Sequence, residues 1–155
     1  MKTTLLTLIM CLCFGIAHGQ DVAVMSAGQG NNGEYLVRVV LSTKKDPGKN
    51  AEALVKEHAV RSVLFKGVAP CKDYQGHAPL VVDPAAETTK APLLETFWRD
   101  GTYQRYVTLQ PGTLSVMKNR QTKMVETSAE LIINKESLVR WLEENKVIEG
   151  FSDLW

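Results

Sequence analysis

Residues 28–44 read GQGNNGEYLVRVVLSTK, so a glycine-rich turn stands directly before an alternating run. In that run Arg38 and Ser42 lie on one side, and the opposite side carries Tyr35, Val37, Val39 and Leu41. A period of two with β-branched and aromatic residues predicts a half-buried strand. Residues 21–27, DVAVMSA, also alternate, and an Asn-Asn-Gly sequence suits the positive φ of a hairpin connection. The stretch therefore predicts two antiparallel strands joined by a turn.

The same glycines, Gly28, Gly30 and Gly33, also match the spacing G-x-G-x-x-G of dinucleotide-binding proteins. That site requires a helix directly after the turn, because the helical N–H groups bind the pyrophosphate. Here the element after Gly33 has the period of a strand. We therefore interpret the glycines as a hairpin turn and expect no cofactor.

Downstream of the hairpin, residues 51–65 change to a helical period, with Asn50 as the expected N-cap and Gly67 as the stop. One stripe of this helix comprises Ala51, Leu54, Val55, His58, Ala59 and Ser62. Val60 and Leu64 lie on the opposite side. We therefore expect the end of this helix to be covered on both faces.

The rest of the chain predicts a short helix at 92–101, three strands and a final helix at 135–145 capped by Asn134. The strands span 103–110, 113–118 and 123–134, with a turn at Pro111-Gly112 and a bulge near Thr127-Ser128. Residues 67–91 have no clear period and contain three prolines. We expect the apolar tail (Val147, Ile148, Phe151, Leu154 and Trp155) to dock on the domain.

The predicted order is β-β-α-(loop)-α-β-β-β-α, which indicates a single two-layer α+β domain over residues 20–155. Its antiparallel sheet should have about four to five strands, covered by two main helices and one short helix. The domain should also contain an irregular loop at residues 67–91, between the first helix and the short helix.

Residues 1–19 have the features of a cleaved signal peptide. Lys2 provides a positive charge, residues 5–16 form an apolar run, and Ala17 and Gly19 are small residues at the −3 and −1 positions of a cleavage site. The run is too short for a spanning helix, which needs roughly 20 apolar residues. We expect an exported protein that is periplasmic, on the outer surface or secreted, without a transmembrane segment in the mature chain.

Cleavage after Gly19 would remove Lys2 and two of the three cysteines. The formal charge would fall from +1 to zero, which predicts no binding to nucleic acid because that function favours clustered Lys and Arg. Only Cys71 would remain, so no internal disulfide can form and stability must come from a hydrophobic core.

Cys71 and His77 could form the reactive pair of a small thiol-dependent enzyme, with His58 as a further base. A metal-dependent enzyme could use these three residues together with Asp73. Structural zinc sites use close pairs such as C-x₂₋₄-C or H-x₃₋₅-H, and neither pair occurs here. We therefore predict no metal site, and we retain the enzyme only as the alternative function.

The preferred hypothesis is a non-catalytic binding or accessory protein that contacts an envelope protein or an envelope polymer. Its expected surfaces are loop 67–91, the apolar tail and an exposed edge strand near residues 21–27. The candidate contact residues are Asp73, Tyr74, His77, Phe97, Trp98 and Trp155.

Two stretches carry a resemblance, 59-AVRSVLFKGVA-69 and 131-LIINKESLVRWLEENKVIEGF-151. They resemble a family of small, secreted, largely uncharacterised proteins of Gram-negative bacteria, a domain of unknown function. The resemblance implies a bacterial export signal and an α+β domain. It implies no activity, so no catalytic residue carries over from it.

We expect the exported chain to begin at Gln20, because the small-x-small pattern ends at Gly19. N-terminal sequencing of protein recovered from outside the cytoplasm measures this directly. A chain that still begins at Met1 would contradict the predicted export.

Overall fold

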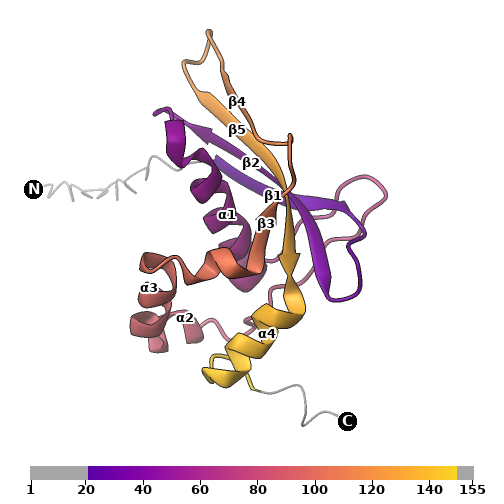
Figure 1. Ribbon diagram of the computed structural model, residues 1–155, viewed down its shortest axis with the longest axis vertical. Coiled ribbons are helices and arrows are strands. Elements are labelled where there is room, and N and C mark those ends of the chain that lie inside the picture. The colour runs from indigo at the N-terminus through magenta and orange to yellow at the C-terminus, as the bar shows by residue number, and fades with distance from the viewer. Residues whose placement is uncertain (1–20, 150–155) are drawn as a thin grey trace, which may run out of the picture.

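The computed structural model describes residues 21–149 (Figure 1). The strands are β1 (Asp21–Gly28), β2 (Glu34–Thr43), β3 (Val107–Leu109), β4 (Ser115–Lys118) and β5 (Val125–Asn134). The helices are α1 (Ala51–Arg61), α2 (Ala86–Thr89), α3 (Ala91–Arg99) and α4 (Lys135–Glu144). Shorter turns are the 3-10 helices Gly48–Asn50 and Thr102–Tyr106 and the π-turn Ser62–Lys66.

Within the described residues, five strands form one antiparallel sheet in the order β1-β2-β5-β3, with β4 also paired to β5. The predicted α+β class with a single antiparallel sheet is confirmed. The predicted hairpin is confirmed as well, because β1 pairs with β2 from Asp21 opposite Ser42 to Gly28 opposite Leu36. Gly33 has a φ of 83°, a left-handed conformation that glycine adopts without steric cost.

The longest pairing joins β2 to β5 over ten residues, from Glu34 opposite Asn134 to Thr43 opposite Val125. Its register does not shift, so the bulge predicted near Thr127-Ser128 is wrong. The irregularity lies instead on the other edge of β5, between β3 and β4.

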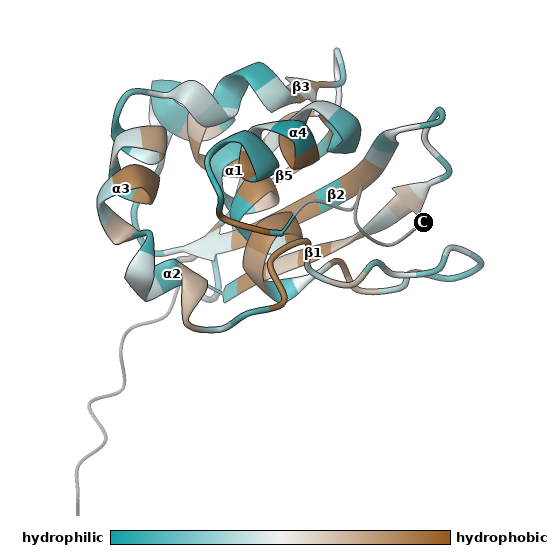
Figure 2. Ribbon diagram, turned by 90° about the horizontal axis from the view of Figure 1, so that it is seen from below, coloured by the Kyte–Doolittle hydropathy of each residue, from teal (hydrophilic) through white to brown (hydrophobic). Residues whose placement is uncertain are grey.

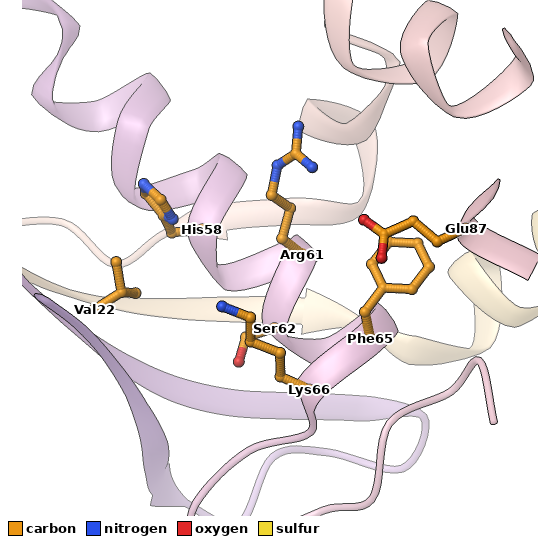
Figure 3. Close-up of a pocket in the computed structure, with 7 residues that line it drawn as sticks. All are labelled: Val22, His58, Arg61, Ser62, Phe65, Lys66 and Glu87. Atoms are coloured by element: carbon orange, nitrogen blue, oxygen red, sulfur yellow. The ribbon is translucent and has the colours of Figure 1, made fainter. Parts of the chain in front are cut away.

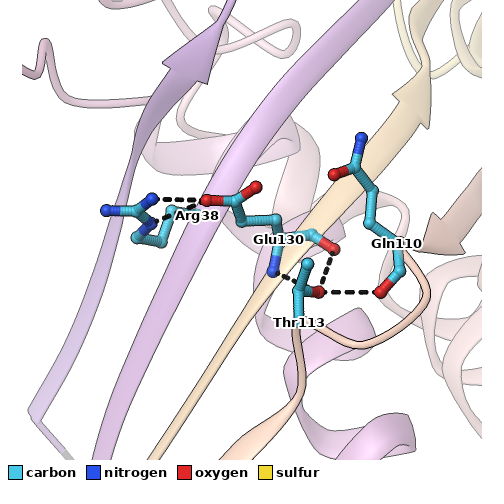
Figure 4. A network of polar contacts seen from close by, with 4 residues as sticks. All are labelled: Arg38, Gln110, Thr113 and Glu130. Carbon is cyan, nitrogen blue, oxygen red and sulfur yellow. Dashed lines mark hydrogen bonds and ion pairs between the residues drawn. The ribbon is translucent and has the colours of Figure 1, made fainter.

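There, β3 and β4 do not form the hairpin that their order suggested. Both strands pair with β5, one after the other along the same edge. The turn at Pro111-Gly112 inserts extra residues between them, and Thr113 bridges the gap (Figure 4). Its Oγ1 donates to the Gln110 carbonyl at 2.8 Å and accepts from the Glu130 N–H at 3.1 Å.

The strand predicted at 103–110 is also too long. Residues Thr102–Tyr106 form a 3-10 helix, and only Val107–Leu109 pair with β5. Tyr103 is buried there and packs 6.4 Å from Phe97, measured between ring centroids. Packing against α3 therefore overrides the strand preference of this aromatic segment.

The longer helices α1, α3 and α4 cover one face of the sheet (Figure 2). Alternate residues of β2 and β5 point into this layer and are fully buried, namely Val37, Val39, Leu41, Leu131 and Ile133. The other face carries the ion pair Arg38–Glu130 and the half-buried Leu36 and Val40.

Val60 and Leu64 are both fully buried, so the expectation that the end of this helix is covered on two sides is confirmed. The loop provides the second cover. The Leu80 N–H donates to the Val63 carbonyl at 3.0 Å, and the Val81 N–H donates to the Leu64 carbonyl at 2.9 Å.

The α-helix ends earlier than predicted, because residues Ser62–Lys66 form a π-turn. The Gly67 N–H donates to the Ser62 carbonyl at 2.7 Å, an i+5 bond. The predicted stop at Gly67 is correct, since its φ of 82° turns the chain out of the helix. A Cβ at this position would lie 2.6 Å from the His77 carbonyl oxygen.

Segment 67–91 contains more structure than the sequence predicted. It includes α2 and a short irregular hairpin in which Val68 pairs with His77 and Cys71 with Tyr74. Ala69 accepts from the Ser26 N–H at 2.8 Å and donates to the Val24 carbonyl at 3.0 Å. The segment thus covers part of the outer edge of β1, which the sequence predicted to be exposed.

The start of the apolar tail packs on the domain, as expected. Val147 is buried in the core and Ile148 packs against it. The remaining predicted tail residues, Phe151, Leu154 and Trp155, lie outside the described residues.

Both predicted N-caps occupy the position before a helix, but only one makes a capping bond. Asn134 Oδ1 accepts from the Ser137 N–H at 2.9 Å. Asn50 makes no side-chain capping bond, because a 3-10 turn precedes α1 there. The nearby Asp46 instead accepts from the Gly48 N–H at 2.8 Å.

Asn134→Ala is therefore expected to lower the free energy of unfolding by about 1 kcal/mol, the usual effect of losing a capping bond. Asn50→Ala is the matched control, since it removes an asparagine at the same helix position without breaking a bond. Urea denaturation measures both. If both variants lost the same free energy of unfolding, the capping bond on α4 would make no specific contribution to stability.

Candidate functional site

The most distinctive surface group is a stack of two rings from distant parts of the chain. The Tyr35 and His77 ring centroids are 4.0 Å apart, with 14° between the ring planes. Lys135 Nζ lies 5.4 Å from the centroid of the Tyr35 ring. Aromatic stacking and a cation near a ring are both favourable arrangements. The group joins β2, segment 67–91 and α4.

The backbone explains why these three residues converge. Because Glu34 lies opposite Asn134, the start of β2 is next to the start of α4. The Glu136 N–H donates to the Gly33 carbonyl at 3.1 Å, which holds the hairpin turn against α4. His77 is held by its two backbone bonds to Val68.

On one side of this stack lies a groove of about 840 Å³, which we call the α4 groove. It is lined by Gly33, Tyr35, Gly76, His77, Ala78, Pro79, Leu80, Val82, Lys135, Glu136, Val139, Arg140 and Glu143. The loop side is apolar, and Val82 there is 82% exposed. The α4 side carries most of the charge, including the pair Arg140–Glu136.

On the other side lies a second pocket of about 560 Å³, which we call the glycine-loop pocket. It is lined by Ser26, Gly28, Gln29, Gly30, Asn32, Glu34, Tyr35, Asp73, Tyr74, Gln75 and His77. The structure thus brings the predicted Asp73, Tyr74 and His77 together. Glu34 and Asp73 make the lining acidic, which is unfavourable for a phosphate. Strand β2 follows the glycines, as the hairpin interpretation requires.

Burial lowers the pKa of His77, and the nearby Lys135 ammonium lowers it further. Both effects disfavour a second positive charge at this point. The stack therefore has a neutral imidazole at neutral pH, which can donate from one ring nitrogen and accept at the other.

The structure separates the residues of the alternative, enzymatic hypothesis. His77 borders the two pockets described above, whereas His58 lines a third pocket between α1 and α2 (Figure 3). Cys71 is half-buried with a free thiol, and within residues 21–149 no hydrogen bond joins its sulfur to either histidine. The described part of the chain also contains no group of three or more His, Cys, Asp or Glu that could hold a metal ion.

Phe97 and Trp98 lie in the helical layer, away from the stack. Phe97 is 2% exposed and packs 4.3 Å from Trp141 between ring centroids, so it has almost no surface to offer a partner. Trp98 is half-buried, with the Arg61 guanidinium 4.2 Å from its ring centroid. The remaining predicted contact residue, Trp155, lies outside the described residues.

Sequence reasoning missed Tyr35, Lys135, Val82 and Val139 as site residues. Tyr35 has the strand period of a core residue, and Lys135 stands at a helix start. No local signal marks either residue, because only the pairing of β2 with β5 places them side by side.

Comparison of the chain with protein-family models, curated proteins and solved structures found no match. Within residues 21–149, no helix has the length and apolar character needed to cross a membrane.

Lys135→Gln is expected to raise the pKa of His77, because it removes a cation that disfavours the protonated imidazole. His58 is an internal control, since burial lowers its pKa, Glu57 opposes the shift, and Arg61 and Lys66 add to it. NMR titration of the two imidazole C–H signals measures both. An unchanged pKa of His77, or the same shift at both histidines, would contradict the proposed coupling.

Proposed function

We propose that this chain is an exported, non-catalytic binding protein of the bacterial cell envelope that holds a segment of a partner protein in the α4 groove. The observation that carries the proposal is the apolar wall of that groove beside the Tyr35–His77 stack. Val82 is 82% exposed at this wall and continues the apolar surface of Pro79 and Leu80, and a contiguous exposed apolar patch is typical of an interaction site.

The groove matches a protein segment in its chemistry. An apolar side chain of the partner would lie against Pro79, Leu80 and Val82, with Val139 on the facing helix. Charged residues of α4, including Arg140 and Glu143, stand where the rim of an interface is usually polar. An apolar centre with a charged rim is typical of helix or strand recognition by a groove.

An envelope polymer of sugar units fits less well. Sugar-binding sites present a flat aromatic face to the ligand, and here the His77 ring stacks on Tyr35. The aromatic side chain that is exposed in the neighbouring pocket is Tyr74, at 42%. We therefore favour a protein partner over a polymer.

Export rests on the signal-peptide pattern of residues 1–19 and on the resemblance to secreted bacterial proteins. The alternative function, a thiol- or metal-dependent enzyme, would need Cys71 close to His77 or His58, and no such contact within the described residues supports it. Cys71 lines neither pocket beside the stack, and His58 belongs to a separate pocket.

A photo-crosslinking amino acid at position 82 is expected to capture a discrete envelope protein when the exported chain is mixed with envelope extract of its own bacterium. Position 117 on β4 is the matched control, because Met117 is also well exposed, at 61%, but lies outside the groove. Mass spectrometry identifies the captured protein.

The second arm uses Val82→Asp, which places a charge on the apolar wall with little effect on folding because the side chain is exposed. Two chains are compared, both with the crosslinker at position 139, one that retains Val82 and one that carries Val82→Asp. We expect the chain with Val82 to capture the partner and the Val82→Asp chain to lose that capture. Equal capture from positions 82 and 117, or capture unaffected by Val82→Asp, would refute the groove as the binding surface.

A further inference from the structure

A third pocket, separate from the α4 groove, lies at the end of α1 (Figure 3). We call it the helix-end pocket. It measures about 670 Å³ and is lined by Val22, His58, Arg61, Ser62, Phe65, Lys66 and Glu87. Most of its residues come from α1 and the π-turn, while β1 and α2 contribute one each.

The π-turn creates this pocket. In an α-helix, residues three or four apart share a face, so His58, Arg61 and Phe65 would form the stripe. The wider i+5 turn closed by Gly67 and Ser62 brings Lys66 round to the same stripe. Single π-turns within helices are frequently found at functional sites, where they reposition one side chain.

The charged residues of α1 and of the helix-end pocket divide into two groups. Lys56 pairs with Glu52 at 2.6 Å, and Arg61 pairs with Glu57 at 2.9 Å. Trp98 also holds the Arg61 guanidinium, so this side chain is fixed on two sides. These charges are neutralised within the helix and its immediate neighbours.

Lys66 and Glu87 form the second group. Both are exposed, and neither makes an ion pair with any residue in the described range 21–149. They line the same pocket and yet do not pair with each other. The pocket therefore presents one free positive charge and one free negative charge, with Phe65 and Val22 as apolar wall.

We propose that the helix-end pocket binds a free amino acid with an apolar side chain, whose carboxylate meets Lys66 and whose ammonium meets Glu87. Phe65 and Val22 contact the side chain of the ligand. His58, held in the pocket wall, contributes a neutral hydrogen-bonding group. The Ser62 hydroxyl is already used, since it donates to the Gly67 carbonyl at 2.7 Å.

Charge balance selects this class of ligand. Arg61 is neutralised by its ion pair with Glu57, which lies outside the lining, and the unpaired Lys66 and Glu87 carry opposite charges. The pocket therefore has no net attraction for a simple anion. The carbonyl end of a helix is also negative, which further disfavours an anion alone. A ligand that carries both charges satisfies both unpaired side chains and leaves neither desolvated without a partner.

The experiment titrates the isotope-labelled exported chain by NMR with three ligands of nearly equal shape. L-phenylalanine carries both charges, N-acetyl-L-phenylalanine only the carboxylate, and L-phenylalanine amide only the ammonium. The two blocked ligands also represent the two ends of a peptide chain. We expect L-phenylalanine to bind most tightly and to shift the backbone signals of residues 62–67 and 87.

Two substitutions test the two contacts separately. Lys66→Gln and Glu87→Gln should each weaken binding of L-phenylalanine by about two- to fivefold, the value of one exposed ion pair. Lys66→Gln should not affect the amide, and Glu87→Gln should not affect the N-acetyl ligand. Lys118→Gln on β4 is the matched control and should change none of the affinities.

Absence of signal shifts at these positions up to the solubility limit of L-phenylalanine would overturn the proposal. Equal or tighter binding of either blocked ligand would also overturn it, since it would show a single-charge site. The α4 groove has different lining residues, so these outcomes neither support nor contradict the proposed protein-binding function.

Discussion

The ten-residue pairing of β2 with β5 is the interaction on which the other features depend. It joins segments about 90 residues apart in the chain, as the partners Arg38 and Glu130 show. It forms the centre of the sheet and creates the buried face on which α1 packs. It also sets the start of α4 beside the hairpin turn, where the Glu136 N–H bonds to the Gly33 carbonyl. Without this register, Tyr35 and Lys135 would not meet.

The loop between α1 and α3 is the second organising element. Its backbone bonds to β1 on one side and to the end of α1 on the other. Through these bonds it positions His77 against Tyr35 and closes α1 with the π-turn. One segment thus builds a wall of the α4 groove and stabilises the helix end that forms the other pocket. The two proposed binding surfaces are therefore both products of how this loop packs.

The segment's tight packing depends on glycine at two points. A Cβ on Gly76 would lie 2.3 Å from the Val68 carbonyl oxygen, and one on Gly67 would lie 2.6 Å from the His77 carbonyl oxygen. Both distances are far below a normal contact. These glycines permit the close approach of Val68 and His77, which in turn holds the imidazole in place.

The sequence by itself determined the hairpin, the α+β class and most element positions, because these follow from local periodicity, glycine and capping chemistry. Alternation in 34–41 specified β2, and Asn134 specified the start of α4. The sequence did not determine that β3 and β4 share one edge of β5, or that Tyr103 lies in a 3-10 helix. Only the tertiary structure decided these points and the two proposed binding surfaces, since segments far apart in the chain bring Tyr35 against His77 and place Glu87 and Lys66 in the lining of one pocket. Local sequence patterns contain no information about such distances, because packing of the whole core sets them.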